Sequence, residues 1–208
     1  MEPAHLVTDR LDIGTLAESD VDAFVEAWQD PLIRRWTNVP SPGTRAQAAH
    51  FVNHFCPEGW REDTHYLFAV RVRATGQIVG PMGFFGMSWV GRSERIATMG
   101  CWTLAAQRGR GYTAEAIRAI ARWGFTELRL DRIESIGEVS NEASLACAVK
   151  VGFTHEGTLR SRLIQDGTRR DAWMASLLPH DLGLEPSMPY ISEPAGHLGG
   201  DVSGSRLR

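Results

Sequence analysis

The chain has 208 residues, of which 43% are hydrophobic and 23% charged, and its formal net charge is −3 at pH 7. This length suits one domain with a single core, and the slight negative charge offers no overall attraction to nucleic acid or to an anionic membrane. Because no apolar stretch is long enough to span a membrane and residues 1–11 lack the basic and apolar blocks of a signal peptide, we expect a cytoplasmic protein without a membrane or nucleic-acid partner.

The sequence has three widely spaced cysteines: Cys56, Cys101 and Cys147. They form no metal-ligand pattern and indicate reduced, mostly buried thiols. His50 and His54 have a helical metal-ligand spacing but no third ligand, so we interpret them as a surface pair and expect no metal. Lys150 is the one lysine among 22 basic residues, which, with abundant alanine and glycine, suggests a GC-rich bacterial genome.

The N-terminal half predicts a strand, two helices and a three-stranded antiparallel meander. Asp20 can cap the first helix, which continues through Trp28 toward Pro31. Short turns separate the three meander strands, and the second of these turns lies near Gly91. In chain order the elements span residues 10–16, 20–31, 46–55, 64–72, 77–87 and 95–104.

The C-terminal half predicts a basic loop, a helix, a strand, a second helix and a hairpin. Apolar residues recur at spacings of three and four along the first helix, and Gly152 ends the second as a C′ residue. The hairpin turns at Asp166-Gly167, where the glycine supplies the positive φ that such turns need. These elements span residues 105–111, 117–128, 131–139, 141–152, 156–164 and 168–178.

This order of elements predicts an α+β fold, with a mixed and mostly antiparallel central sheet and helices on both faces. Strand and helix do not alternate throughout, as they would in a doubly wound sheet. From about His180 onward, proline, glycine and serine break any periodicity. We therefore expect one domain over residues 1–180 and a flexible tail over residues 181–208.

The loop Arg-Gly-Arg-Gly-Tyr-Thr at residues 108–113 precedes a predicted helix. The first N–H groups of a helix are unpaired and partly positive, glycines permit close approach, and two arginines add charge. The loop therefore predicts a pyrophosphate site, with a solvated basic turn as the alternative. No GxxxxGK(S/T) motif occurs, which excludes a P-loop. The glycines also fit the G-x-G-x-x-G/A pattern of a dinucleotide-binding fold. In that fold the acidic residue about 20 positions later lies at the end of a strand, whereas Asp131 precedes the predicted strand here.

Residues 100–116, GCWTLAAQRGRGYTAEA, resemble the acyl-CoA signature R/Q-x-x-G-x-G/A of the GNAT superfamily of N-acetyltransferases. Residues 140–153, SNEASLACAVKVGF, and the hairpin after them resemble the subgroup that contains the ribosomal-protein N-terminal acetyltransferases. The likeness runs from Thr8 to about Leu178. It implies a GNAT-like fold with splayed strands at the acetyl-CoA site, acetyl-CoA as co-substrate and no metal.

The resemblance also implies roles for single residues. Trp102, Thr103 and Leu104 would present backbone groups to the pantetheine arm, which would lie along the strand like an added strand. Asn141 would bind the pantetheine, and Ser144 would approach the sulfur. The residues that would hold the pyrophosphate are Arg108, Gly109, Arg110, Gly111, Tyr112 and Thr113.

This chain departs from the family pattern at several positions. Ala105 stands where the subgroup usually has proline, and Thr113 stands where glycine or alanine is expected. Thr98 replaces a strand glutamate that serves some relatives as a base. Ala148 replaces the tyrosine that many members use as a general acid, which leaves Ser144 as the candidate donor to the thiolate.

Acetyl transfer needs a neutral amine, a donor to the developing oxyanion and a proton for the thiolate. Exposing the neutral form at pH 7 costs ~1.4 kcal/mol for an α-amine but ~4–5 kcal/mol for a lysine. A base acting through one water therefore suffices, and Glu156 and Asp171 are the candidates. For Asp171 an ion pair with a neighbouring arginine is the alternative. The oxyanion donor is expected to be a backbone N–H near Leu104, and a helix-start role is the alternative for Ser144.

Several aromatic residues could line an acceptor pocket, although we interpret most of them as core: Trp28, Trp36, Phe51, Phe84 and Phe85. Cys101 has no histidine partner and is expected to be a buried thiol. We expect an N-acetyltransferase, monomeric or homodimeric, that moves the acetyl group of acetyl-CoA to a primary amine in a ternary complex. The alternative, from another functional class, is a CoA-binding module that does not catalyse transfer. A dinucleotide-binding protein is the third hypothesis.

Overall fold

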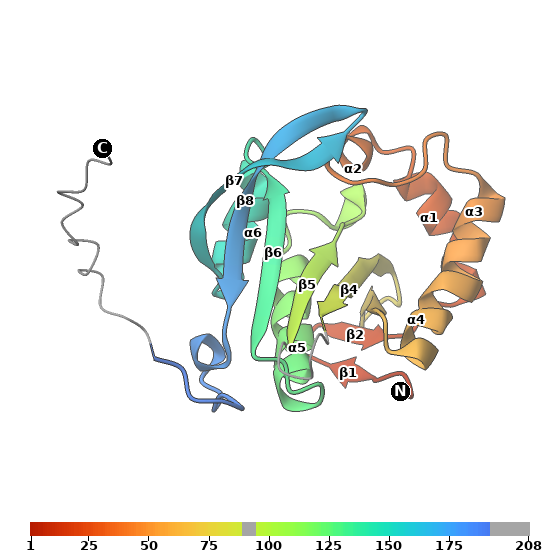
Figure 1. Ribbon diagram of the computed structural model, residues 1–208. Helices are drawn as coiled ribbons and strands as arrows, with labels where there is room; N and C mark the ends of the chain where they lie inside the picture. The colour runs from red at the N-terminus through yellow and green to blue at the C-terminus, as the bar shows by residue number, and fades with distance from the viewer. Residues whose placement is uncertain (89–94, 192–208) are drawn as a thin grey trace, which may run out of the picture.

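The computed structural model describes residues 1–88 and 95–191. One sheet with strand order β1-β2-β3-β4-β5-β6-β8-β7 organises the molecule (Figure 1). Its strands are β1 (Leu6–Val7), β2 (Leu11–Gly14), β3 (Tyr66–Val72), β4 (Ile78–Ser88), β5 (Ile96–Cys101), β6 (Arg132–Glu138), β7 (Thr154–Gln165) and β8 (Thr168–Leu177). Neighbours are antiparallel except for β5 and β6. The predicted mixed, mostly antiparallel α+β fold is confirmed.

Helices cover both faces of this sheet. They are α1 (Val21–Ala27), α2 (Pro31–Trp36), α3 (Arg45–His50), α4 (Cys56–Glu62), α5 (Tyr112–Thr126) and α6 (Glu142–Val151). A π-helical turn, η2 (Phe51–Phe55), joins α3 to α4 without a break, so this helix runs beyond the predicted end at residue 55. Single 3-10 turns occur at η1 (Glu18–Asp20), η4 (Ala105–Gln107) and η5 (Pro179–Leu182).

The single helix predicted over residues 20–31 is two helices in the structure. The Asp30 carboxylate accepts hydrogen bonds from the N–H groups of Leu32 and Ile33, at 2.7 and 3.4 Å, and so caps α2. Pro31 follows at the first helical position, where its missing N–H costs nothing. The cap turns the chain between α1 and α2, and this Asp-Pro signal was present in the sequence.

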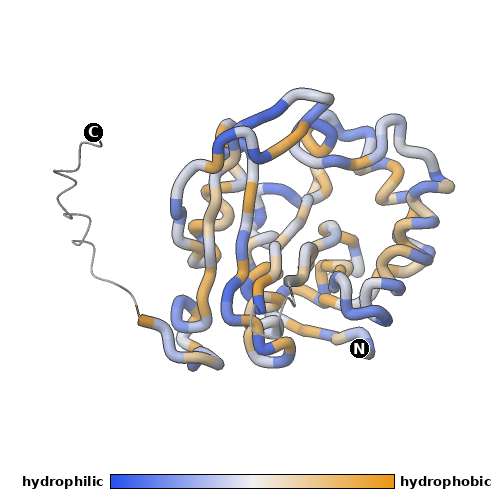
Figure 2. The backbone as a smooth tube through the Cα atoms, viewed as in Figure 1, coloured by the Kyte–Doolittle hydropathy of each residue, from blue (hydrophilic) through white to orange (hydrophobic). Residues whose placement is uncertain are grey.

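Alternation along β3 divides the core into two layers. Phe68 and Val70 point toward α5, whereas Leu67 and Ala69 point toward α1 and α3. All four side chains are buried. Figure 2 shows hydrophobic residues along the strands and the helices that cover them, and hydrophilic residues at the tip of the β7–β8 hairpin.

The β5 and β6 strands pair over only a short distance. Their parallel register runs from Ile96↔Arg132 to Thr98↔Glu134. Beyond it β5 stays with β4 as far as Cys101, and β6 stays with β8 as far as Glu138. The predicted splay of two strands is therefore present, and it opens a gap in the middle of the sheet.

Beyond residue 180 the described chain still contacts the domain. Leu182 is buried in the core, and Arg122 on α5 donates a hydrogen bond to its carbonyl oxygen at 2.7 Å. Residues 192–208 of the predicted tail, and the predicted turn near Gly91, lie outside the described residues. Among the residues described, no helix has the length and apolar character that crossing a membrane requires.

The packing of α5 on β4 gives a stability prediction. A Cβ added at Gly124 would lie 2.6 Å from the Phe84 ring and 3.0 Å from Leu130. We expect Gly124→Ala to lower the free energy of unfolding by roughly 1–2 kcal/mol, because overpacking outweighs the better helix propensity of alanine. Urea denaturation measures this change in the free energy of unfolding. A Gly124→Ala variant more stable than the parent would contradict the prediction and show that the Phe84 ring can move aside at little cost.

Candidate functional site

A cavity of about 1380 Å³ lies where β5 and β6 diverge. One side is lined by β5, α5, β6 and α6, and the other by Trp28, which follows α1, and by residues of α2, α3 and η2. A single small-molecule site usually occupies about 300–1,000 Å³. This cavity therefore has room for two ligands side by side.

Backbone hydrogen bonds continue from β5 into the segment after it. The N–H groups of Trp102 and Leu104 donate to the carbonyl oxygens of Pro81 and Val79, at 3.4 and 2.9 Å. Two of the three predicted pantetheine residues, Trp102 and Thr103, line the cavity, and Leu104 is not among the lining residues. The N–H of Leu104 is therefore already used inside the protein.

The opposite edge of β5 faces the gap. Backbone groups of successive residues in a strand alternate in direction, and those of Trp102 and Leu104 point to β4. The N–H groups of Cys101 and Thr103 must then point toward the gap. Both residues lie beyond the stretch of β5 that pairs with β6, so this edge can accept an extended ligand as an added strand.

Positive charge gathers at the N-terminus of α5. Gly111 is the N-cap with φ of 78°, a left-handed conformation that glycine adopts without strain. Arg10 Nη2 and Lys150 Nζ lie 3.6 and 3.9 Å from the position that a Cβ would take there. Arg10 is paired with Glu115, whereas Arg110 and Lys150 form no ion pair among the described residues. With the helix dipole, these groups suit an anion, and this region is called the anion site below.

Arg108 has another role in the same loop. Its guanidinium donates to the Asp30 carboxylate at 2.7 Å and to the Thr103 carbonyl oxygen at 3.0 Å. Burial opposes ionisation of Asp30, but the bonds from the Leu32 N–H and from Arg108 outweigh it and lower the Asp30 pKa. Arg108 therefore ties the loop to the cap of α2, although it also lines the cavity.

The other predicted loop residues divide between the cavity and the surface around it. Gly109, Gly111 and Thr113 line the cavity, whereas Arg110 and Tyr112 do not. Thr113, which stands where the family has glycine or alanine, forms a hydroxyl–hydroxyl hydrogen bond with Thr103 at 2.7 Å. The branched side chain is thus fixed against the strand instead of filling the loop.

The start of α6 brings Asn141 and Ser144 to the cavity. The side-chain oxygen of Asn141 accepts a hydrogen bond from the Ser144 N–H at 3.2 Å, so Asn141 is the N-cap. The Ser144 hydroxyl makes no hydrogen bond within the described residues. The helix start is therefore completed by Asn141, and the Ser144 hydroxyl is left to face the cavity.

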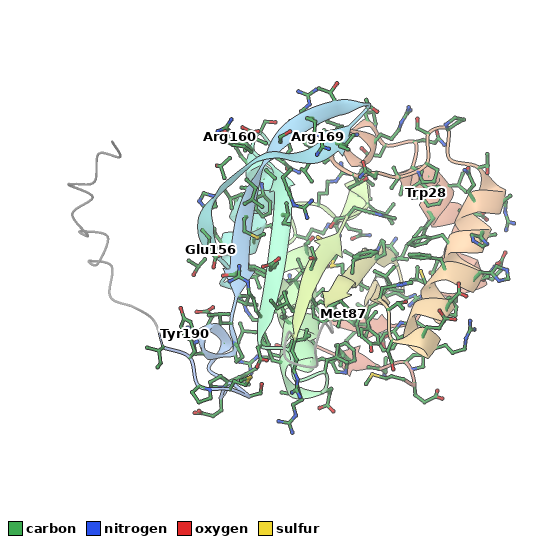
Figure 3. The ribbon with its side chains drawn as sticks, in the orientation of Figure 1. Trp28, Met87, Glu156, Arg160, Arg169 and Tyr190 are labelled. Atoms are coloured by element: carbon green, nitrogen blue, oxygen red, sulfur yellow. The ribbon has the colours of Figure 1, made fainter. Side chains whose placement is uncertain are left out.

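The two predicted carboxylates lie outside the cavity lining. Glu156 receives two hydrogen bonds from Arg132, at 2.9 and 2.6 Å, and one from Ser176 at 2.6 Å. The Arg132 bonds are the main cause of its lowered pKa. Figure 3 shows Glu156 at the outer side of the hairpin, across the molecule from Trp28. Glu156 is not among the described residues that line the cavity, and none of its contacts is with Ser144.

Asp171 supports the hairpin. Its carboxylate accepts a hydrogen bond from the Ser161 N–H at 2.7 Å, where β7 bulges and Ser161 has φ of 56°. No ion pair with Arg169 or Arg170 is found among the described residues. The local contact of Asp171 is thus with a strained backbone turn, and its role as a base stays a prediction.

Cys101 corrects one expectation. The residue as a whole is exposed and lines the cavity, contrary to the expectation of a buried residue, although its sulfur is desolvated by the protein. The protein around it raises the pKa of its thiol to about 12, through desolvation first and the nearby Cys147 second. The thiol therefore stays protonated near neutral pH and is a poor nucleophile.

Residues that the sequence did not single out also reach the cavity. Lys150 comes from the last turn of α6, and the one signal in the sequence was that it is the only lysine.

Four of the five candidate aromatic residues line the cavity, and Phe84 does not; the four are Trp28, Trp36, Phe51 and Phe85. Trp28 is also core, since it is 3% exposed. Both interpretations of these aromatics therefore hold in part.

Helix α2 bridges the two halves of the site. Arg35 donates to both carboxylate oxygens of Glu138 at the end of β6, at 2.6 and 2.7 Å. Gln165 at the hairpin tip donates to the Arg34 carbonyl oxygen at 3.2 Å, and Figure 1 shows this tip reaching α2. Together with Asp30 and Arg108, these contacts fix α2 across the gap.

A family model described as "Acetyltransferase (GNAT) domain" matches residues 10–154 of the chain. The uncharacterized N-acetyltransferase p20 of Bacillus licheniformis is 27% identical over 176 residues, which cover 85% of this chain and 97% of that protein. Among described residues, no group of three or more histidine, cysteine, aspartate or glutamate side chains could hold a metal ion.

Solved structures share the fold. The microcin C7 self-immunity acetyltransferase MccE, in complex with acetyl-CoA and AMP, aligns with a TM-score of 0.72 and 19% identity over 82% of this chain and 93% of that one. The ribosomal-protein-S5-alanine acetyltransferase of Vibrio fischeri aligns with a TM-score of 0.72 and 17% identity, over 84% and 96% of the two chains.

The Arg35–Glu138 pair predicts a dependence of stability on pH. Hydrogen bonds from Arg35, then from Ser140, lower the pKa of Glu138 from its ordinary value of 4.5 to about 2. Because the folded-state pKa is lowered, the stabilisation is complete above about 4.5, declines below it and is lost as the pH falls through about 2.

The measurement is the free energy of unfolding of the parent minus that of Glu138→Gln, taken from pH 7 to pH 2. We expect a difference in favour of the parent that is constant from pH 7 to 5 and shrinks in more acid solution. A difference that stayed constant down to pH 2 would contradict the ion pair.

Proposed function

The chain belongs to the GNAT acetyltransferase family, and from this premise we propose that it transfers the acetyl group of acetyl-CoA to a primary amine by direct attack in a ternary complex. The observation that carries the proposal is the continuity of the site. The gap beside β5 leads from the anion site at Gly111 to a second, aromatic-lined half of the same cavity. We further propose a cytoplasmic location.

The residues of the gap suit acetyl-CoA. Arg110, Lys150 and the first N–H groups of α5 would hold the pyrophosphate, with Gly109, Gly111, Tyr112 and Thr113 shaping the loop. The open edge of β5 would pair with the amide groups of the pantetheine. The side-chain N–H₂ of Asn141 has no partner among the described residues and would bind the same arm. Arg108 supports the loop through Asp30.

Acetyl-CoA supplies a thioester, which already activates the acetyl carbon. The backbone N–H of Cys101, on the open edge of β5, would stabilise the negative charge that develops on the carbonyl oxygen. This assignment replaces the expected donor near Leu104, because the Leu104 N–H is bonded to Val79. The Ser144 hydroxyl would give a proton to the sulfur as the C–S bond breaks.

The proton that leaves the amine would pass to water. No aspartate or glutamate is found among the described residues that line the cavity, so the proposal includes no carboxylate in contact with the amine. An α-amine loses its proton near pH 8, and exposing its neutral form at pH 7 costs only ~1.4 kcal/mol. A role for Glu156 or Asp171 through a chain of waters stays a prediction.

The proposal predicts selective stabilisation by the cofactor. Acetyl-CoA or CoA at a hundredfold excess over its dissociation constant should stabilise the fold by about 2.7 kcal/mol and raise the melting temperature. NAD and ATP at the same concentration should raise the melting temperature much less.

Arg110→Ala should weaken CoA binding about tenfold, and by a smaller factor at high salt, because the Arg110 charge acts on the pyrophosphate.

Arg160→Ala is the matched control, since it removes the same charge from an exposed position on β7. It should bind CoA like the parent. A larger melting shift with NAD than with CoA, or equal losses in the two variants, would place the pyrophosphate elsewhere.

Ser144 gives the catalytic prediction. Ser144→Ala should lower kcat roughly 10- to 1000-fold, because the hydroxyl interacts with the thiolate more strongly in the transition state than in the ground state. Acetyl-CoA binding and the melting temperature should change little, since Asn141 caps the helix. Steady-state kinetics and thermal melts on the same samples measure both.

Ser140→Ala, the same chemical change on an exposed serine just before α6, is the control: it removes one bond to Glu138 but leaves both Arg35 bonds in place, and it should keep the parent kcat. If Ser144→Ala were as active as Ser140→Ala, the thiolate would take its proton from water. Binding of CoA without acetylation of any amine would favour a CoA-binding module and overturn the proposed function.

A further inference from the structure

We infer that the acceptor is a weakly basic amine with one positive charge and an aromatic or bulky apolar group, such as the α-amine of an aromatic amino acid. The inference rests on the proposed function and specifies its substrate class. It comes from the half of the cavity that lies away from the anion site, between α2, α3 and β4.

Aromatic rings form the wall of this half. Phe51 and Phe55 stack with centroids 5.3 Å apart, Phe55 stacks on His65 at 4.1 Å, and His65 is nearly parallel to Phe85 at 6.4 Å. Phe51, Phe55 and Phe85 line the cavity, and Phe55 is 36% exposed. Trp36 adds another ring from α2. Such a surface gains free energy by covering an aromatic or apolar group.

The charge of the cavity is unsuited to a polyamine. Its lining includes Arg108 and Lys150, and no aspartate or glutamate among the described residues. Two acids at α2 are already paired, Asp30 with Arg108 and Glu138 with Arg35. A second or third ammonium group would therefore lose its water without gaining a counter-charge, which is costly.

Proton loss points to the same class of amine. The described lining has no carboxylate and one histidine, His50, to take up the proton of the amine, so the free-energy cost of reaching the neutral form still selects among acceptors. At pH 7 that costs ~1.4 kcal/mol for an α-amine and ~4–5 kcal/mol for a lysine side chain. A weakly basic α-amine therefore fits the site, and a lysine-like or polyamine nitrogen does not.

The wall is held in place before any ligand binds. Helix α2 carries Leu32, Ile33 and Trp36 into the lining, and its contacts with Glu138, Arg108 and Gln165 fix it from three directions. A preorganised wall loses little conformational entropy when an apolar group enters. The aromatic half can therefore select the acceptor by its side group.

The test compares four amines at pH 7.5 on the full-length parent: phenylalanine amide, alanine amide, Nα-acetyl-lysine amide and spermidine. We expect kcat/KM for phenylalanine amide to exceed that for alanine amide by about tenfold to a hundredfold, the effect of burying one phenyl group. The other two amines should react more slowly than phenylalanine amide. Equal values for the first two amines, or a preference for either of the last two, would overturn the inference.

A peptide that begins with phenylalanine distinguishes a free amine from a protein N-terminus as the source of this group. Faster reaction of the peptide than of the amide identifies an N-terminus that starts with an aromatic residue, and slower reaction identifies a small amine. Either result supports the inferred chemistry, provided that a matched peptide beginning with alanine reacts at least tenfold more slowly. Equal rates for the two peptides and for the two amides would exclude it.

Ala46 offers a variant that changes charge without disturbing the core. It is exposed, lines the cavity and lies in the first turn of α3, where glutamate suits the helix dipole. Ala46→Glu should raise kcat/KM for spermidine roughly threefold to tenfold over Ala46→Gln, its uncharged isosteric control. An equal response of the two variants would contradict a charge-selective wall.

Calorimetric titration of the CoA-loaded parent separates the two hypotheses. If no amine is acetylated but phenylalanine amide binds more tightly than spermidine, the proposed function fails and the inferred ligand class stands. If amines are acetylated with spermidine preferred, the proposed function stands and the inference fails. If nothing is acetylated and phenylalanine amide does not bind, both fail.

Discussion

The early end of the β5–β6 pairing is the constraint on which the rest of the molecule depends. Parallel hydrogen bonding stops at Thr98↔Glu134, yet each strand keeps its other neighbour, so the gap opens without loss of the sheet. One edge of β5 thereby keeps free backbone donors in the middle of the protein. The α5 N-terminus lies at one end of this gap and the aromatic wall at the other, so the splay sets the order in which two ligands must lie.

Local signals in the sequence were sufficient for most of the framework. The glycine loop before α5, the cap at Asn141 and the Asp166-Gly167 turn each depend on a few neighbouring residues, and the structure has all three elements. The contacts that complete the site are long-range. Asp30 and Arg108 are far apart in the chain, as are Arg35 and Glu138, and no periodicity connects them. Sequence patterns therefore predicted the starts of α5 and α6 better than the long-range contacts that hold α2.

Ser144 illustrates what only geometry can decide. A serine in the first turn of a helix is as suited to capping as to catalysis, and the sequence does not decide between these two hypotheses. The structure gives the capping bond to Asn141, whose side chain reaches the Ser144 N–H. Thr113 is a second case: its branched side chain looked unfavourable in the loop, but its hydroxyl is bonded to Thr103. In both cases one hydrogen bond to a nearby residue determines what the residue can do.

The distribution of charge links the two halves of the cavity. Arg10 is neutralised by Glu115, and Arg108 by Asp30, whereas Arg110 and Lys150 have no acidic partner among the described residues. The absence of lining carboxylates in the described part leaves the cavity net positive, which favours an anionic cofactor. The same field raises the cost of a polycation and favours the neutral form of an amine over its ammonium form. A single arrangement of charges can thus attract the acetyl donor, help to deprotonate the acceptor and exclude acceptors that carry more than one charge.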